Sequence, residues 1–159
     1  VKDRKGPWVV TRTLSKAFAL AGLRLGYALC SSQEITNALR LTTSTFNLSG
    51  IAEAAAIAAF EDKGYTQFIL EENSREMSRI KKGCQDLGLA YMDSVTNFIS
   101  IDTGVESGPV VRALRDRGVR VSTPGYDATG TYIRASTGLP EDTDAFLSAL
   151  EDVLARQSD

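Results

Sequence analysis

Residues 13–30, TLSKAFALAGLRLGYALC, form an apolar stretch whose only charged residues are Lys16 and Arg24. Apolar runs at 7–13 and 23–30, bounded by Gly and Pro, predict two strands of a well-buried sheet joined by a turn. Both charged side chains must then enter apolar surroundings or a site that holds an anion. Desolvation disfavours an ammonium and favours the neutral amine that a Schiff-base lysine needs. The stretch therefore predicts a strand, a turn and a strand, with a nucleophilic lysine in the turn.

Composition excludes several classes of protein. With 159 residues and 43% hydrophobic content, the chain can bury one ordinary core. A net charge of −2 gives no electrostatic reason to expect nucleic acid or an anionic membrane as partner. The chain has no histidine, which excludes Ser-His-Asp and Cys-His catalysis, and Cys30 and Cys84 have no second ligand nearby, so no metal site is expected.

The ends of the chain and its hydropathy bear on its location. No apolar run reaches the roughly 18 residues of a membrane span, and the start, VKDRKG, does not resemble a signal peptide. We therefore expect a cytoplasmic protein. Because the chain opens without Met and runs almost at once into a strand-like segment, we also expect it to be a fragment of a longer protein.

Three helices are predicted before residue 88. Ser31 and Glu34 make a capping-box pattern for a helix that ends near residue 41. Residues 49–62 predict a second helix, in which alanine covers nearly every side. Such a helix is either buried at a domain or subunit junction or merely a segment of high helix propensity. Residues 65–87 predict a long third helix with a partial apolar stripe.

From residue 88 onward, short strands alternate with helices. We expect strands near 89–92, 97–102, 118–122 and 131–135, and helices at 107–117 and 141–155. Pro140 followed by two acidic residues is a good helix start. This region is predicted to be a small α+β unit with a mostly antiparallel sheet and helices on one face.

Ser15, Lys16 and Arg24 together suggest a chemistry. A tight turn could bring the hydroxyl and the guanidinium around one anion while the lysine points at an attached ring. Pyridoxal phosphate needs this combination, an amine for its aldehyde and donors for its phosphate. Short patterns of this kind are common, so the residues alone do not establish the cofactor.

The amino-acid sequences of several segments resemble those of one family. TLSKAFALAGLRLGY is similar to the lysine segment of the fold-type I pyridoxal-phosphate aminotransferases, in particular the histidinol-phosphate aminotransferase branch. The similarity continues through FNLS at 46–49, TNFISI at 96–101 and YIRASTG at 132–138. It implies the C-terminal portion of an α/β enzyme: part of the large cofactor-binding domain at 1–45, linking helices at 46–87 and a small α+β domain at 88–159.

The resemblance also implies roles for individual residues. Lys16 would be the Schiff-base lysine and would move a proton during the reaction. The cofactor phosphate would be held by Thr13, Ser15 and Arg24. Arg134 would bind the substrate α-carboxylate, because its planar fork suits a planar anion. Asn97 would line the same pocket.

Each assignment has a simpler structural alternative. Lys16 could be a lysine whose stem alone lies on apolar surface, and Arg24 a partner in a structural ion pair. Asn97 could cap the end of a strand, and Arg134 could face solvent on an alternating strand.

The chain departs from the family pattern in two ways. Where histidinol-phosphate enzymes usually carry an arginine that grips the substrate phosphate, GVRVSTPG has Ser122, while Arg120 lies two residues earlier on what we expect to be the same strand face. Either Arg120 replaces it or the substrate lacks a phosphate. The groups that contact the cofactor ring lie upstream of the lysine segment in the family, so these 159 residues alone are expected to be inactive.

The expected function is that of an aminotransferase of amino-acid biosynthesis, which moves an amino group between an amino acid, or an amine like histidinol phosphate, and a 2-oxo acid. The resemblance implies a homodimer. A decarboxylase or cyclase on the same scaffold is the nearest alternative, since the lysine and phosphate motif is shared. A non-catalytic assembly module is the alternative from a different class.

Overall fold

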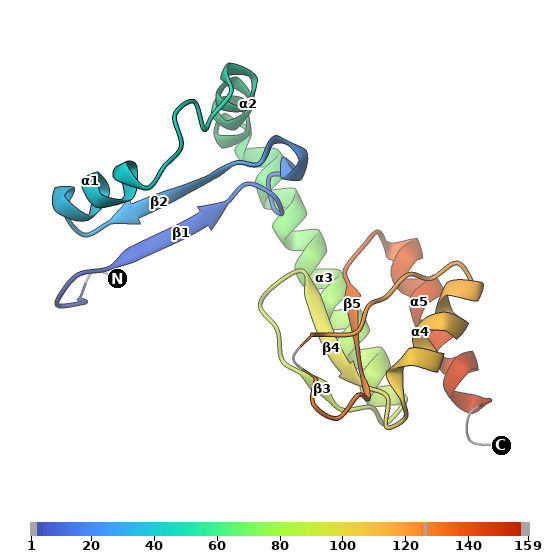
Figure 1. Cartoon of the computed structure of the whole chain (residues 1–159). Coiled ribbons are helices and arrows are strands. Elements are labelled where there is room, and N and C mark those ends of the chain that lie inside the picture. The colour runs from blue at the N-terminus through green and yellow to red at the C-terminus, as the bar shows by residue number, and fades with distance from the viewer. Residues whose placement is uncertain (1–2, 126, 157–159) are drawn as a thin grey trace. The chain divides into compact units, whose positions relative to one another are not determined.

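The computed structural model describes residues 3–125 and 127–156, and the chain divides into two compact units, Val1–Ile69 and Leu70–Asp159 (Figure 1). Each unit has its own cluster of buried apolar side chains. In the described part of the chain, no helix has the length and apolar character needed to cross a membrane.

The first unit contains a two-stranded antiparallel ribbon, β1 (Val9–Thr13) and β2 (Gly26–Cys30), with Thr13 opposite Gly26. Both strands are largely exposed, so the well-buried sheet expected from their apolar residues is wrong for this chain. The ribbon pairs only with itself among the described residues, and a two-stranded ribbon has no second layer to cover it. At Gly26 a Cβ atom would lie 2.8 Å from the Arg12 carbonyl oxygen, which explains the glycine there.

Helices α1 (Gln33–Leu41) and α2 (Gly50–Glu61) follow the ribbon. Ser32 and not Ser31 caps α1, because the Ser32 hydroxyl accepts a hydrogen bond from the Ile35 N–H at 3.3 Å. Ser31 instead accepts one from the Trp8 N–H at 3.0 Å. The predicted capping residue was therefore wrong by one position.

Helix α2 is the alanine-rich helix. Its first residue follows Ser49, whose hydroxyl accepts from the Ala52 N–H at 3.1 Å. Only Ala52 of α2 is buried, while Ile51 and Ile57 are 78% and 54% exposed. Within this chain, therefore, only one side of α2 is covered, and burial at a domain or subunit junction, one of the two interpretations of its alanine content, stays a prediction.

The second unit contains the sheet β3 (Tyr91–Met92), β4 (Phe98–Asp102) and β5 (Tyr132–Ser136), in that order and antiparallel throughout. Its helices are α4 (Ser107–Asp116), α5 (Pro140–Ala155) and the part of α3 (Lys63–Asp86) after residue 69, and α4 and α5 lie side by side next to the sheet (Figure 1).

Alternation along the two longer strands decides which face of this sheet is buried. Ile99 and Ile101 of β4 and Ile133 and Ala135 of β5 are at most 2% exposed, and they pack against apolar residues of α3, α4 and α5. The intervening residues face the other way. The predicted antiparallel α+β unit with helices on one face is confirmed.

The strand predicted at 118–122 is wrong. Gly118 has φ +82°, and the Val119 N–H bonds the Leu114 carbonyl at 3.0 Å, so the chain is still closing the end of α4. Only Ser122 pairs with the sheet, through two backbone hydrogen bonds to Arg134 at 2.6 and 3.1 Å. Arg120 consequently does not lie on a strand face shared with Ser122.

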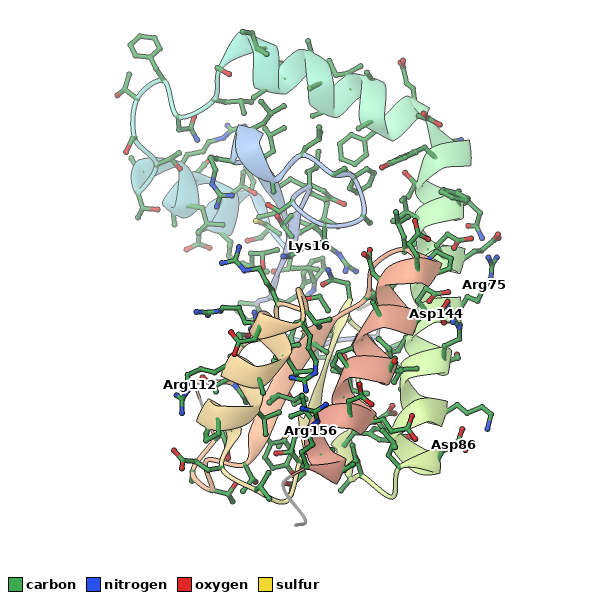
Figure 2. The ribbon with its side chains drawn as sticks, turned by 90° about the vertical axis from the view of Figure 1, so that its right-hand side faces the viewer. Lys16, Arg75, Asp86, Arg112, Asp144 and Arg156 are labelled. Atoms are coloured by element: carbon green, nitrogen blue, oxygen red, sulfur yellow. The ribbon has the colours of Figure 1, made fainter. Side chains whose placement is uncertain are left out.

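A polar network joins α3 to the start of α5. Glu76 is 1% exposed, and one of its oxygens accepts from Arg79 Nη1 at 2.7 Å. Arg79 also pairs with Asp144 and donates to the Pro140 carbonyl at 3.1 Å. Asp144 lies on the side of α5 that faces α3 (Figure 2). The network therefore fixes the first turns of α5 against α3.

Candidate active site

The loop between β1 and β2 carries the predicted lysine, and apolar residues anchor it at both ends. Leu14 and Leu25 are 2% and 7% exposed, and the Leu14 N–H bonds the Leu25 carbonyl at 3.1 Å. They cluster with Ala52 of α2, and the Leu20 N–H returns to the Leu14 carbonyl at 3.0 Å. The leucines of the loop therefore anchor it to the rest of the first unit.

The polar residues of the loop lie on its outer side. Thr13 Oγ1 donates to Ser15 Oγ at 2.9 Å, and the Ser15 N–H donates to Thr13 Oγ1 at 3.0 Å. Lys16 follows directly and is exposed on the same loop (Figure 2). Its carbonyl accepts from the Ala19 N–H at 2.9 Å, which makes a tight turn after the lysine. The structure therefore brings Thr13, Ser15 and Lys16 together.

Arg24 lies at the other end of the loop, after the short helix η1 (Ala21–Leu23). Its backbone has φ 54°, in the left-handed region that non-glycine residues rarely adopt. Arg24 Nη1 donates to the Ala21 carbonyl at 2.7 Å. Since a guanidinium carries five N–H donors, this bond leaves others for an anion. The structure gives no contact between Arg24 and the two hydroxyls among the described residues.

Lys16 and Arg24 were expected either in apolar surroundings or at a site that holds an anion, and the first alternative is wrong for this chain, because both side chains are exposed. The leucines on either side take the inward positions, so the charged residues are left on the outside. The donor set nonetheless fits a phosphorylated aldehyde. Two hydroxyls and a guanidinium suit a phosphate, and an accessible primary amine suits an aldehyde.

Arg134 lies in β5 on the face of the sheet opposite the helices, and it is exposed. Its guanidinium carbon lies 4.8 Å from the centre of the Phe98 ring. Ser122 pairs with Arg134 across an antiparallel bridge, so both side chains project from the same face. Ser122 stands where the resemblance implies a phosphate-binding arginine, and this position is therefore beside Arg134.

Asn97 comes directly before β4, and its carbonyl accepts from the Thr137 N–H at 3.0 Å, just after β5. The Thr137 hydroxyl donates to Asn73 Oδ1 of α3 at 2.8 Å, and Asn73 Nδ2 donates to the Thr96 carbonyl at 3.3 Å. These bonds hold Asn97 next to the end of the strand that carries Arg134.

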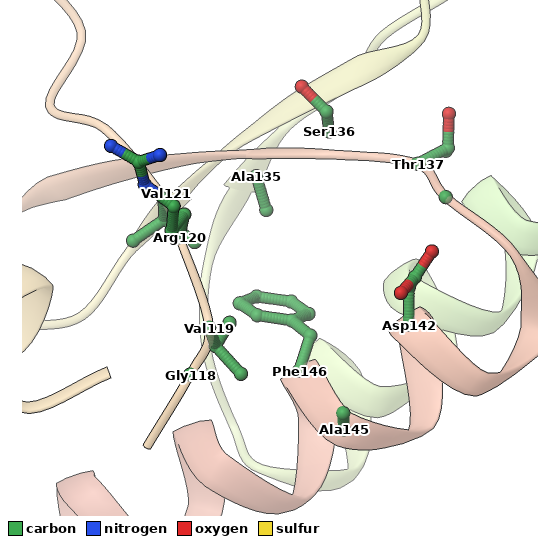
Figure 3. Close-up of a pocket in the computed structure, with 11 residues that line it drawn as sticks. Gly118, Val119, Arg120, Val121, Ala135, Ser136, Thr137, Asp142, Ala145 and Phe146 are labelled. Carbon is green, nitrogen blue, oxygen red and sulfur yellow. The ribbon is translucent and has the colours of Figure 1, made fainter. Parts of the chain in front are cut away.

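Arg120 is placed differently. It lines a hollow of about 270 Å³ between the 118–121 segment, the end of β5 and α5 (Figure 3). Ala135 and Phe146 also line this hollow, and both belong to the core side of the sheet. Arg134 is not among the lining residues, so the structure does not bring Arg120 and Arg134 into one hollow.

The turn before β5 is held by Asp127. Its carboxylate accepts from the Thr129 hydroxyl at 2.6 Å and from the Tyr132 N–H at 2.8 Å. The Thr129 hydrogen bond is the main reason that the pKa of the Asp127 carboxyl lies below its ordinary value. The carboxylate therefore orders the chain two residues before Arg134.

Our interpretation of the sequence missed Phe98, Asn73 and Thr137. Phe98 follows Asn97 in the TNFISI segment. Because side chains alternate along a strand, the apolar residues Ile99 and Ile101 place Phe98 on the opposite face of the sheet from Ile99, and this signal could have identified it. Asn73 lies in the amphipathic helix α3, far from Asn97 and Thr137 along the chain, and no sequence pattern around it indicates a functional residue.

Comparison with known proteins supplies a further line of evidence. The family described as aminotransferase class I and II matches residues 1–150. The chain is 42% identical over 147 residues to histidinol-phosphate aminotransferase 2 of Pseudomonas aeruginosa, covering 92% of this chain and 40% of that protein. It therefore spans about 40% of the length of such curated relatives.

Two solved structures are similar as well. One is histidinol-phosphate aminotransferase from Sinorhizobium meliloti in complex with pyridoxal-5'-phosphate, with 34% identity, a TM-score of 0.80, and coverage of 94% of this chain and 41% of that one. The other is a decarboxylase from Sulfurospirillum multivorans, with 29% identity, a TM-score of 0.74, and coverage of 92% and 43%. These matches confirm the fold expected from the sequence.

Proposed function

Because the chain belongs to the aminotransferase class I and II family, we propose that it is the lysine-bearing portion of a pyridoxal-phosphate aminotransferase. The observation that carries this proposal is the exposed Lys16 directly after the hydroxyl pair of Thr13 and Ser15. The longer enzyme would move an amino group between an amino acid, or an amine like histidinol phosphate, and a 2-oxo acid.

Each residue of the loop has a separate task in this proposal. Pyridoxal phosphate, when bound, supplies an aldehyde and an electron-accepting ring. Thr13, Ser15 and Arg24 would hold its phosphate through two hydroxyls and a guanidinium. Lys16 would hold the aldehyde end of the cofactor through its amine and would take the proton from the substrate α-carbon.

We assign the substrate α-carboxylate to Arg134, with Asn97 beside it. A planar guanidinium can hold a carboxylate through two parallel hydrogen bonds. Ser122 leaves the position beside Arg134 uncharged, which supports an amino donor without a phosphate. The contact of Arg120 with substrate stays a prediction. Arg120 lines a hollow that Arg134 does not line.

The test uses the full-length protein with Lys16→Ala and, as a matched control, Lys5→Ala, which removes another exposed lysine of the same unit. Borohydride reduction after adding pyridoxal phosphate, followed by peptide mapping, should place a covalent group on Lys16 and not on Lys5. Transamination should be lost in Lys16→Ala alone. Retained single-turnover chemistry in that variant would contradict the proposal.

A decarboxylase is the second candidate, since the Sulfurospirillum decarboxylase resembles this chain at 29% identity. The reaction depends on which bond of the α-carbon is held perpendicular to the cofactor ring. Product analysis separates the two, because a decarboxylase releases CO2 whereas an aminotransferase produces a 2-oxo acid.

The organisation of the longer protein remains a proposal too. We propose that 1–45 belong to the large cofactor-binding domain, 46–87 link it and 88–159 form the small domain. A homodimer, a cytoplasmic location and a place in amino-acid biosynthesis stay predictions. A folded sample of this chain that neither binds pyridoxal phosphate nor is trapped by borohydride would favour the assembly-module alternative for the isolated chain.

A further inference from the structure

The backbone of Arg134 is held on both edges of its strand. On one side β5 pairs with β4, where Ser100 is the partner of Arg134. On the other side Ser122 exchanges two backbone hydrogen bonds with Arg134 at 2.6 and 3.1 Å. The position of the Arg134 Cα atom is therefore well defined, and what remains to be fixed is the orientation of its long side chain.

Phe98 supplies a surface for that side chain. It pairs with Ser136, two residues beyond Arg134, so Phe98 and Arg134 are diagonal neighbours on the same face of the sheet. Aromatic and long side chains reach each other across such a diagonal. The Arg134 guanidinium carbon indeed lies 4.8 Å from the centre of the Phe98 ring.

A ring contact leaves the hydrogen-bonding edge of a guanidinium available. Cation–π attraction acts on the face of the planar group, while its N–H donors point outward in the plane. None of the ion pairs within the described part of the chain involves Arg134. The ring thus positions the guanidinium without competing for the donors that an anion would use.

We propose that Phe98 is a positioning residue that holds the Arg134 guanidinium ready for the substrate α-carboxylate. This inference rests on the proposed function of Arg134. Ordering a free arginine side chain costs entropy at the moment of binding, and a ring that orders it beforehand removes part of that cost. An exposed cation–π contact corresponds to about a two- to fivefold change in affinity.

The experiment uses the full-length protein with L-glutamate and 4-aminobutyrate, two amines that differ by the α-carboxylate. Dissociation constants are measured for Phe98→Leu, for Phe98→Tyr and for Arg134→Ala. Tyr132→Leu is the matched control, because it removes another aromatic ring from the same face of β5. We expect Phe98→Leu to weaken L-glutamate about two- to fivefold and to leave 4-aminobutyrate unchanged.

Phe98→Tyr should keep the affinity of the natural protein for L-glutamate, since tyrosine keeps the ring face. Tyr132→Leu should leave this affinity unchanged. Arg134→Ala should weaken L-glutamate by on the order of a hundredfold, because charge-assisted hydrogen bonds are lost. If Arg134→Ala weakens L-glutamate but Phe98→Leu does not, the positioning role of Phe98 is overturned alone. If Arg134→Ala has no effect, the proposed role of Arg134 fails and the inference fails with it.

Discussion

Replacing Arg79 by methionine should destabilise the unit Leu70–Asp159, because the buried carboxylate of Glu76 loses its partner. Arg79 Nη1 lies 2.7 Å from an oxygen of Glu76, whose side chain is 1% exposed. The other Glu76 oxygen, Oε1, is buried without a hydrogen-bond partner in the described structure. In the Arg79→Met variant, a buried carboxylate would therefore lose its counter-charge.

The magnitude follows from what is left behind. Removing one partner of a fully buried ion pair typically costs about 3–5 kcal/mol, because the remaining charge is uncompensated. The Arg79 side chain is 35% exposed, so water replaces part of its contact, and leaving the buried Glu76 carboxylate without its partner is expected to cost about 2 kcal/mol. Asp144 adds little to this cost, since its side chain is 69% exposed and water can replace Arg79. For a unit of this size, about 2 kcal/mol lowers Tm by roughly 8–16 °C.

The double variant Glu76→Met/Arg79→Met separates the buried charge from the lost packing. Methionine keeps much of the volume of both side chains and leaves no charge behind, so we expect this variant to lie within about 1 kcal/mol of the natural protein. Amide hydrogen exchange in β4 and β5, the two longer strands of this unit, measures its free energy of opening.

Two results would contradict this reasoning. A loss below about 1 kcal/mol in Arg79→Met would mean that water reaches Glu76 or that the pair contributes nothing. A double variant as unstable as Arg79→Met would mean that packing, and not the uncompensated charge, causes the loss.

Further predictions concern α3 and the cysteines. Gly83→Ala should destabilise the protein by about 1–3 kcal/mol in urea unfolding, because a Cβ there would lie 2.5 Å from Leu147 Cδ2. A Cβ at Gly64 in the same helix would meet only Asp62 Oδ1, at an ordinary contact distance of 3.8 Å, so Gly64→Ala should be neutral or stabilising by up to about 1 kcal/mol. Burial raises the pKa of the Cys84 thiol to about 11, so iodoacetamide should modify Cys30 but not Cys84 in the folded protein, as seen by mass spectrometry. Equal labelling of both cysteines would refute the burial of Cys84.

Local sequence patterns predicted most of the helices and strands of the second unit. Alternation at 97–102 and at 131–135 is a short-range signal, and it correctly predicted the two strands in which Ile99, Ile101 and Ile133 are buried. Pro140 and the acidic residues after it also marked the start of α5 correctly. The pattern failed at 118–122, where the valines alternate as in a strand but complete the end of α4 and its core contacts.

The candidate site was predictable to the extent that its residues are close together in the chain. Thr13 and Ser15 are joined by hydrogen bonds and Lys16 follows directly, so all three lie within four consecutive residues and their order along the chain already implies their proximity. Their exposure was not predictable in this way. It depends on Leu14 and Leu25, which face inward into a cluster that includes Ala52 of α2.

The sequence by itself determined the family, the candidate lysine and phosphate donors, and the alternation that makes one face of the sheet apolar. These are properties of neighbouring residues, and neighbouring residues interact whatever the rest of the chain does. Only the tertiary structure decided that Phe98 lies against Arg134 and that Arg79, an i,i+3 neighbour of Glu76 on α3, also binds the start of α5. Phe98 and Arg134, like Arg79 and Pro140, are brought together by strand register and helix packing, which arise from many weak contacts over the whole unit.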